Sequence, residues 1–171
     1  MKKVELYIPK LEDYWYQEKI QSDPLTMDYN KGYDVNYYGY HYDTGCIDFP
    51  KDKWEEMYNK RIKENRYFAY IKDLDLNEYV GYVNYQYVND KYECGILIES
   101  KYRGLGYSKP AIELLCKTAK ENGIKELYDN FEVDRVNALE LFESCGFRIV
   151  KEETWNKFDK EVRGVIVKKE L

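Results

Sequence analysis

One glycine-containing segment decides the fold: Ile98-Glu99-Ser100-Lys101-Tyr102-Arg103-Gly104-Leu105-Gly106-Tyr107-Ser108-Lys109-Pro110. It predicts the end of a strand, a tight loop, and a helix with proline in its first turn. Glycines let a backbone turn tightly and approach a ligand closely. A helix start offers unpaired N–H groups and the positive end of the helix dipole, and Arg103 and Lys109 add positive charge. We therefore expect an anion-binding loop here.

Two familiar phosphate-binding patterns do not match this loop. The dinucleotide pattern G-x-G-x-x-G fails because Lys109 stands where its third glycine belongs. The Walker pattern fails because the chain contains no Gly-Lys-Ser or Gly-Lys-Thr. A glycine pair alone is equally well explained by an ordinary tight turn.

The sequence on either side of the loop predicts one α+β domain over residues 1–171. Gly123 is expected to end the helix that contains Pro110, and Asp134 to cap a later helix that runs to Cys145. Residues 66–98 read as three strands joined by short turns, which predicts an antiparallel meander. The expected strands cover residues 4–8, 66–72, 79–88, 92–98, 124–131, 147–153 and 162–168, and further helices cover 11–21 and 51–65.

Composition excludes several classes of protein. No apolar run approaches the ~18 residues of a membrane span. The 27 basic residues are dispersed among 32 acidic ones, with a net charge of −5, so nucleic acid is a poor partner and a cationic substrate fits better. Four dispersed cysteines and a single histidine argue against a metal site of the zinc type. The N-terminus does not read as a signal peptide, and we expect a cytoplasmic protein.

Two motifs resemble those of one large enzyme family. The segment Arg103, Gly104, Leu105, Gly106, Tyr107, Ser108 matches the acyl-CoA signature R/Q-x-x-G-x-G/A. The segment Asn137 to Phe147 resembles a later helix with the pattern A-x-x-L-Y-E-K-x-G-F. Residues 92–147 as a whole resemble the GNAT superfamily of N-acetyltransferases.

The resemblance implies a fold and a cofactor site. It implies a mixed, mostly antiparallel central sheet with flanking helices, in which the strand ending at Ile98 diverges from the strand near residues 125–130. Acetyl-CoA would lie in that cleft as a co-substrate, without a metal. Its pantetheine would pair with the backbone around Leu97 and Ile98, and its pyrophosphate would lie on the amides of residues 103–108. Family members often dimerise, so the resemblance is compatible with a homodimer, although the sequence does not give the oligomeric state.

Three positions depart from the family pattern. Ser108 replaces the final Gly or Ala of the loop and is small enough to fit. Phe142 replaces the tyrosine that often protonates the departing thiolate, and Arg135 replaces an asparagine seven residues earlier. Either another group or solvent supplies that proton, or the chain does not catalyse the usual transfer.

A general base is also needed, because an amine must lose its proton before it attacks a thioester. The family often places a glutamate on the strand before the loop, and Glu93 stands there. A half-buried Glu93 would have a raised pKa. The alternative is an outward-facing carboxylate with no role. Lesser candidates are Glu99, Tyr82, Tyr85 and Tyr128.

The segment of residues 22–50 is acidic and rich in tyrosine. It reads as a long connection with little helical periodicity, and is either a binding loop or a solvated one. Within the family resemblance it would form the acceptor side, because aromatic faces and carboxylates attract ammonium groups. His41 reads as surface and Cys145 as core. The positions expected to bind the acceptor are Asp34, Tyr37, Tyr38, Tyr40 and Asp43.

Three functions are compatible with the sequence, and the first is the one that we expect. The first is acetyl transfer from acetyl-CoA to an amine of a small cationic molecule or peptide, by direct attack in a ternary complex. The second is a non-catalytic acyl-CoA-binding or regulatory domain, which the residues Phe142 and Arg135 favour. The third is a protein-interaction module built on exposed tyrosines.

Overall fold

The structure, a computed structural model, describes residues 1–171 and contains one seven-stranded sheet in the order β1-β2-β3-β4-β5-β7-β6. All neighbours are antiparallel except β4 and β5, which run parallel. The expected α+β class and antiparallel meander are therefore confirmed. The strands are β1 (Val4–Tyr7), β2 (Tyr67–Asp73), β3 (Glu78–Val88), β4 (Lys91–Ile98), β5 (Glu126–Glu132), β6 (Arg148–Lys157) and β7 (Lys160–Glu170).

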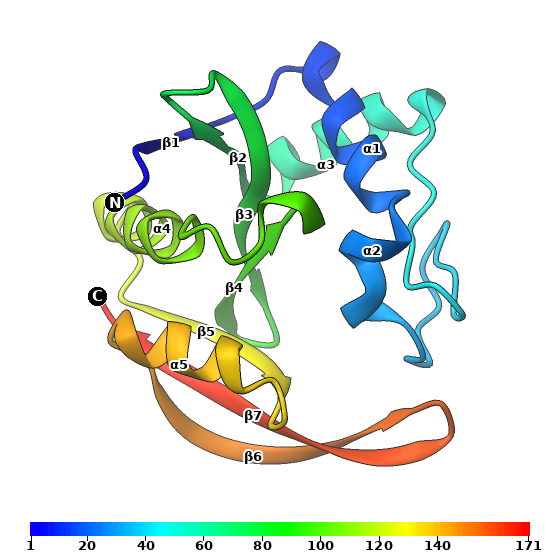
Figure 1. The fold of residues 1–171 in the computed structure, drawn as a ribbon, viewed down its shortest axis with the longest axis vertical. Coiled ribbons are helices and arrows are strands. Elements are labelled where there is room, and N and C mark those ends of the chain that lie inside the picture. Colours follow the sequence, from blue (N-terminus) through cyan, green and yellow to red (C-terminus); the bar gives the residue numbers. More distant parts are fainter.

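Helices cover both faces of the sheet (Figure 1). On one face lie α4 (Ser108–Glu121) and α5 (Val136–Ser144), and the two chain termini lie near them (Figure 1). On the other side lie α1 (Trp15–Gln21), α2 (Pro24–Met27) and α3 (Trp54–Lys63). Single turns of 3-10 helix occupy Leu11–Asp13, Asp28–Asn30, Lys51–Lys53 and Ser100–Tyr102.

The larger hydrophobic core lies under α4 and α5. One stripe of α4 is buried there, because apolar residues recur at helical spacing. Pro110 lies in its first turn, where a missing N–H costs nothing, and Gly123 follows its end with φ +83°. The buried residues of α4 are Pro110, Ala111, Ile112, Leu115, Cys116 and Ala119.

A smaller core lies on the opposite face, under α1 and α2, and is rich in tyrosine. Tyr16 and Tyr70 pack edge to face with ring centroids 5.1 Å apart. Their hydroxyls bond to Glu99 and to the carbonyl oxygen of Asp13. Buried tyrosines are tolerated here because each hydroxyl finds a partner. No helix is long and apolar enough to cross a membrane.

Several boundaries differ from the sequence expectations. Residues 22–50 are not helix-free, since Asp23 caps α2 by accepting a bond from the Leu25 N–H. The helix expected over residues 11–21 is broken into a 3-10 turn and α1, and the one over 51–65 also begins with a 3-10 turn. The last two strands extend to a tight turn at Phe158 and Asp159, both with positive φ.

Candidate functional site

The loop between β4 and α4 presents a row of unpaired amides. The backbone N–H groups of residues 104–109 donate to no acceptor in the chain. Gly104 and Gly106 have φ +76° and +92°, and no atom lies within 4 Å of a Cβ built on either. These amides precede and begin a helix of 14 residues, so the helix dipole adds to their positive potential. We call residues 103–109 the anion loop.

Two tyrosines fix the anion loop to the turn between β2 and β3. The Tyr107 hydroxyl donates to Asp73 Oδ2 over 2.5 Å, and the Tyr102 hydroxyl donates to Glu78 Oε2 over 2.6 Å. The first bond lowers the pKa of Asp73, while burial and that carboxylate raise the pKa of Tyr107 to about 12. The loop is therefore held open before any ligand binds.

Arg103 binds protein carbonyls instead of extending into solvent. Its Nε donates to the Ile98 oxygen over 3.1 Å, its Nη1 to the Leu25 oxygen over 3.1 Å, and its Nη2 to the Thr26 oxygen over 2.6 Å. Its own backbone N–H donates to the Ser100 oxygen. Arg103 thus joins the anion loop to α2. Its guanidinium nitrogens and its backbone N–H already have acceptors, unlike the backbone amides of residues 104–109.

The other loop residues are open to solvent to different degrees. Leu105 and Lys109 are exposed, and Ser108 is half-buried. Lys109 remains available as a cation beside the amides, because it forms no ion pair in the structure. Ser108 is the first residue of α4, so its amide belongs to the helix N-terminus.

β4 pairs with β5 at a single residue, and the rest of its edge toward Ile98 has no strand partner on that side. The two strands are in register only at Glu93 and Tyr128. The Glu99 N–H donates to Val80 on β3, and alternate residues of a strand direct their backbone groups to opposite neighbours. Ile96 and Ile98 therefore direct their backbone N–H and C=O groups toward the space between β4 and β5, which we call the gap. Leu97 directs its backbone toward Tyr82 on β3, so it is less suited to pantetheine than its neighbours.

Two carboxylates stand where β4 and β5 part. Glu93 is half-buried with Lys91 Nζ 3.8 Å from its Oε1. Burial raises the pKa of Asp129 to about 7; the Asn130 N–H and the charge of Arg135 oppose the shift, and the charge of Glu93 adds to it. Asp129 lies on the same face of β5 as Leu127 and Phe131 by alternation.

Asp129 did not emerge from the sequence expectations, although the sequence carries a signal for it. The order Leu127-Tyr-Asp129-Asn-Phe131 places an acidic residue between two core residues of an alternating strand. A polar residue at such a position is either paired or functional, because burying a carboxylate is costly. Its raised pKa matches what a general base needs near neutral pH.

The two departures from the family pattern occupy different surroundings. Phe142 is buried and packs against Phe131 and Phe147, with ring centroids 5.5 and 5.0 Å away. It cannot donate a proton. Arg135 is exposed and its guanidinium lies over the Tyr29 ring at 5.4 Å. Cys145 is buried, as expected.

Residues 22–50 pack against the β6–β7 hairpin. The Phe158 N–H donates to the Gly32 oxygen over 2.8 Å, and the Tyr42 ring meets Phe158 at 5.3 Å. The Tyr33 hydroxyl donates to Glu132, which also binds Lys157 Nζ at 3.0 Å. Burial opposes ionisation of Glu132, but these two bonds outweigh it and lower its pKa. The segment thereby forms a wall facing the end of β5.

The five expected acceptor residues do not form one cluster. Tyr37 lies near Tyr29 and Tyr82, on the side of the gap opposite α4; it is 46% exposed, and its partial burial raises its pKa. The Tyr40 hydroxyl donates to the Asn30 oxygen and accepts the Tyr33 N–H, so Tyr40 holds the segment together. The other three, Asp34, Tyr38 and Asp43, are exposed on the outside.

The lesser candidates are occupied by structural contacts. Glu99 is buried, accepts the Tyr16 hydroxyl at 2.8 Å, and lies 3.6 Å from Lys19. The hydroxyl of Tyr85 accepts from Asn122, that of Tyr82 from Gln21, and that of Tyr128 donates to Glu126. His41 Nε2 lies 2.9 Å from Asp48 Oδ1 in an exposed pair.

An open strand edge that leads to unpaired amides at a helix start is what the family resemblance implied. A family model described as the acetyltransferase (GNAT) family matches residues 30–147. The chain belongs to the GNAT acetyltransferase family. Its fold class and its expected family are thereby confirmed.

Two curated proteins resemble this GNAT protein at low identity. An uncharacterized protein of Methanocaldococcus jannaschii, MJ1062, is 30% identical over 115 residues, which are 64% of this chain and 24% of that protein. The spermidine N(1)-acetyltransferase of Vibrio cholerae is 26% identical over 100 residues, 56% of this chain and 58% of that protein. The chain thus spans less than two thirds of the length of both curated relatives.

Solved GNAT structures share the whole fold. The crystal structure of spermidine N-acetyltransferase from Vibrio cholerae, in complex with CoA and spermine, superimposes with a TM-score of 0.76. The match covers 98% of this chain and 95% of that one at 18% identity. At this identity the likeness shows the fold alone.

Proposed function

We propose that this chain transfers the acetyl group of acetyl-CoA to an amine of a small cationic molecule, by direct attack in a ternary complex. One observation carries the proposal. Glu93 of β4 and Asp129 of β5 stand at one end of the open edge of β4, and the anion loop stands at the other end. Membership of the GNAT family supports the same reaction.

The chain fits the cofactor at two places. Six free amides, with open space above Gly104 and Gly106, suit the two negative phosphates of a pyrophosphate. The backbone groups of Ile96 and Ile98 suit the amides of the pantetheine arm. From Cys94 to Ile98 the strand extends roughly 13 Å, which places the reacting end near the carboxylates. Acetyl-CoA supplies an activated acetyl thioester.

The protein's own part in the chemistry is to orient groups and move one proton. A backbone N–H on the open edge of β4 can donate to the thioester carbonyl oxygen as negative charge develops there. Asp129, with a pKa of about 7, takes the proton that the attacking ammonium must lose. The same proton can pass to the departing thiolate, since Phe142 has none to give.

The acceptor side favours a cation. Tyr29, Tyr37 and Tyr82 lie close together beside the gap, and aromatic faces attract ammonium groups. Glu93, whose side chain shares a face of β4 with Leu97 of the smaller core, adds negative charge on this side. Because the Vibrio cholerae structure with the same fold was solved with spermine, polyamines are the first acceptors to test, and peptide amino groups the second.

A non-catalytic acyl-CoA-binding domain is the second candidate, and Phe142 favours it. The residue that often serves as the acid in the family is here part of an aromatic core. Cofactor binding without turnover would then be the result. The cytoplasmic location and the homodimer stay predictions.

The test is the amine-dependent release of CoA thiol from acetyl-CoA. Spermidine, spermine, a short peptide and glycerol are offered to the wild type and to Asp129→Asn. We expect release with an amine but not with glycerol, and a loss of about 100-fold or more in the variant. Cofactor binding with no release for any amine would support the second candidate.

A further inference from the structure

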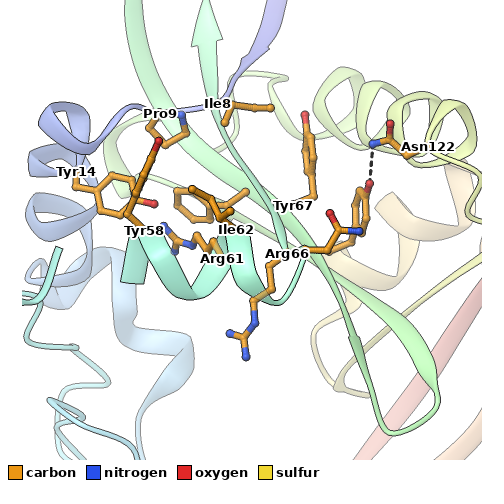
Figure 2. A pocket seen from close by; sticks show the side chains of 12 residues that line it. Ile8, Pro9, Tyr14, Tyr58, Arg61, Ile62, Arg66, Tyr67 and Asn122 are labelled. Atoms are coloured by element: carbon orange, nitrogen blue, oxygen red, sulfur yellow. Dashed lines mark hydrogen bonds between the residues drawn. The ribbon is translucent and has the colours of Figure 1, made fainter. Parts of the chain in front are cut away.

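A second cavity lies away from the proposed acyl-CoA site, between α3 and the C-terminal end of α4. Its volume is about 340 Å³. Figure 2 shows Tyr14 and Tyr58 on one side, Tyr67 and Asn122 on the other, and Ile8 and Pro9 along the edge between them. The gap between β4 and β5 contributes none of its lining residues.

Arg61 is the distinctive group of this cavity. Its guanidinium lies 3.6 Å from the Phe68 ring centroid and 5.2 Å from that of Tyr14. Its Nη1 donates to Gln17 Oε1 over 3.0 Å. No carboxylate lies within ion-pair distance of it, and burial lowers its pKa. Gln17 and Tyr14 take only part of its five N–H donors, so the guanidinium has donor groups to spare for an anion.

The charge around the cavity is one-sided. Its twelve lining residues include two arginines and neither aspartate nor glutamate, in a chain whose net charge is −5. Arg66 is neutralised by Glu64, with 2.5 Å between Nη2 and Oε2, and extends away from the cavity in Figure 2. Arg61 is therefore the cation that a ligand would meet.

The walls of the cavity are flat and apolar. The Tyr67 and Tyr85 rings stack at 5.0 Å with 7° between their planes. Asn122 fixes the Tyr85 hydroxyl through a bond of 2.8 Å. Ile8 and Ile62, each 64% exposed, form the apolar rim of the cavity.

We propose that this cavity binds a small planar carboxylate, such as an aromatic acid, with its carboxylate on the Arg61 guanidinium and its ring among Tyr67, Ile8 and Pro9. Guanidinium and carboxylate match in a bidentate pair. A volume of about 340 Å³ accommodates a ligand of one or two rings. The proposal does not depend on the acetyl transfer proposed above.

The test is a titration with benzoate and 2-naphthoate, followed by chemical-shift changes of the amides of α3 and β2. The matched probe is benzamide, which has the same ring without the charge. We expect saturable shifts around Arg61 with both acids, and binding of benzamide weaker by about tenfold or more. Equal binding of benzamide, or shifts with inorganic phosphate alone, would overturn the proposal.

Variants separate the site from a general effect on folding. Arg61→Gln should weaken benzoate binding by about tenfold or more, while Arg163→Gln, on an exposed arginine of β7, should leave it unchanged. Ile62→Trp fills the rim of the cavity from an exposed helix position and should abolish binding without unfolding the chain. Unchanged binding in Ile62→Trp would contradict the proposal even if Arg61→Gln fails to fold.

Discussion

Glu93 on β4 and Tyr128 on β5 form the one residue pair through which these parallel strands stay in register. Toward Ile98 the facing edge of β4 has no further partner on β5. The sheet is therefore interrupted at its centre, where a strand ladder would normally be most continuous. The carboxylates of Glu93 and Asp129 lie at this interruption, and the anion loop lies beyond Ile98, so both ends of the unpaired edge carry groups that suit a ligand.

Replacement of Asp129 should change how stability depends on pH. The folded-state pKa of about 7 lies above the ordinary value of 3.8, so between roughly pH 4 and pH 7 the folded chain holds a proton that the unfolded chain has released. The free energy of unfolding from this group falls as pH rises through that window. Asp129→Asn should remove the fall and be more stable than wild type at pH 8 by about 1 kcal/mol or more.

Urea denaturation at pH 5 and pH 8 measures this difference. Asp52→Asn, on an exposed residue, is the matched control and should change stability equally at both values. The same pH dependence in Asp129→Asn and wild type would show that Asp129 ionises normally.

Replacement of Glu93 should shift the acidic limb of the pH–rate profile, and the limb itself should remain. The negative charge of Glu93 contributes to the raised pKa of Asp129. In Glu93→Gln, the acidic limb of kcat/KM against pH should therefore shift to lower pH, because the base loses its proton more easily. If the limb disappears in Glu93→Gln and persists in Asp129→Asn, the base is Glu93 and not Asp129.

Arg103 should matter more for stability than for cofactor affinity. Its guanidinium donates to three carbonyl groups, of Ile98, Leu25 and Thr26. Arg103→Ala should lower the free energy of unfolding by about 1–3 kcal/mol and leave the Kd for acetyl-CoA within a few-fold. Thermal unfolding and calorimetric titration give the two quantities. A tenfold loss of affinity with unchanged stability would mean that the side chain contacts phosphate instead.

Tyr37 and Tyr38 are neighbours with different expected roles. Tyr37, 46% exposed, lies near Tyr29 and Tyr82 beside the gap, whereas Tyr38, 64% exposed, has Lys53 over its ring. Tyr37→Ala should raise KM for the amine by roughly 3–10-fold with little change in kcat, since it removes a cation–π contact. Tyr38→Ala should leave both constants unchanged. Equal effects from both variants would place the acceptor elsewhere.

Much of the fold could be predicted from the sequence because its signals are local. Pro110 and Gly123 bracket α4, and the alternating strands between residues 66 and 98 give the meander. The anion loop could be located because two glycines precede a helix start. The same reasoning missed α2, since four residues carry almost no periodicity.

The side-chain partners in the site could not be predicted, because they depend on contacts between distant residues. Arg103 bonds to Thr26, 77 positions away, and Tyr33 bonds to Glu132, 99 positions away. Tyr40 was expected to bind the acceptor and instead bonds to the Asn30 backbone. Asp129 needed the fold to show that it follows Tyr128, the one residue of β5 paired with β4, and that its carboxyl is desolvated.

The central claim is that the anion loop binds acetyl-CoA, and two matched glycine variants test it. Gly106 and Gly123 stand before and after α4, both have positive φ, and neither has an atom within 4 Å of an added Cβ. Tryptophan at either position therefore carries similar backbone strain, but only Gly106→Trp fills the loop.

The measurement is thermal unfolding with and without acetyl-CoA at about 100 times its Kd, which should stabilise a binding-competent chain by ~2.7 kcal/mol. We predict this stabilisation in the wild type and in Gly123→Trp, and none in Gly106→Trp. No stabilisation of the wild type, or equal stabilisation of Gly106→Trp, would contradict the account.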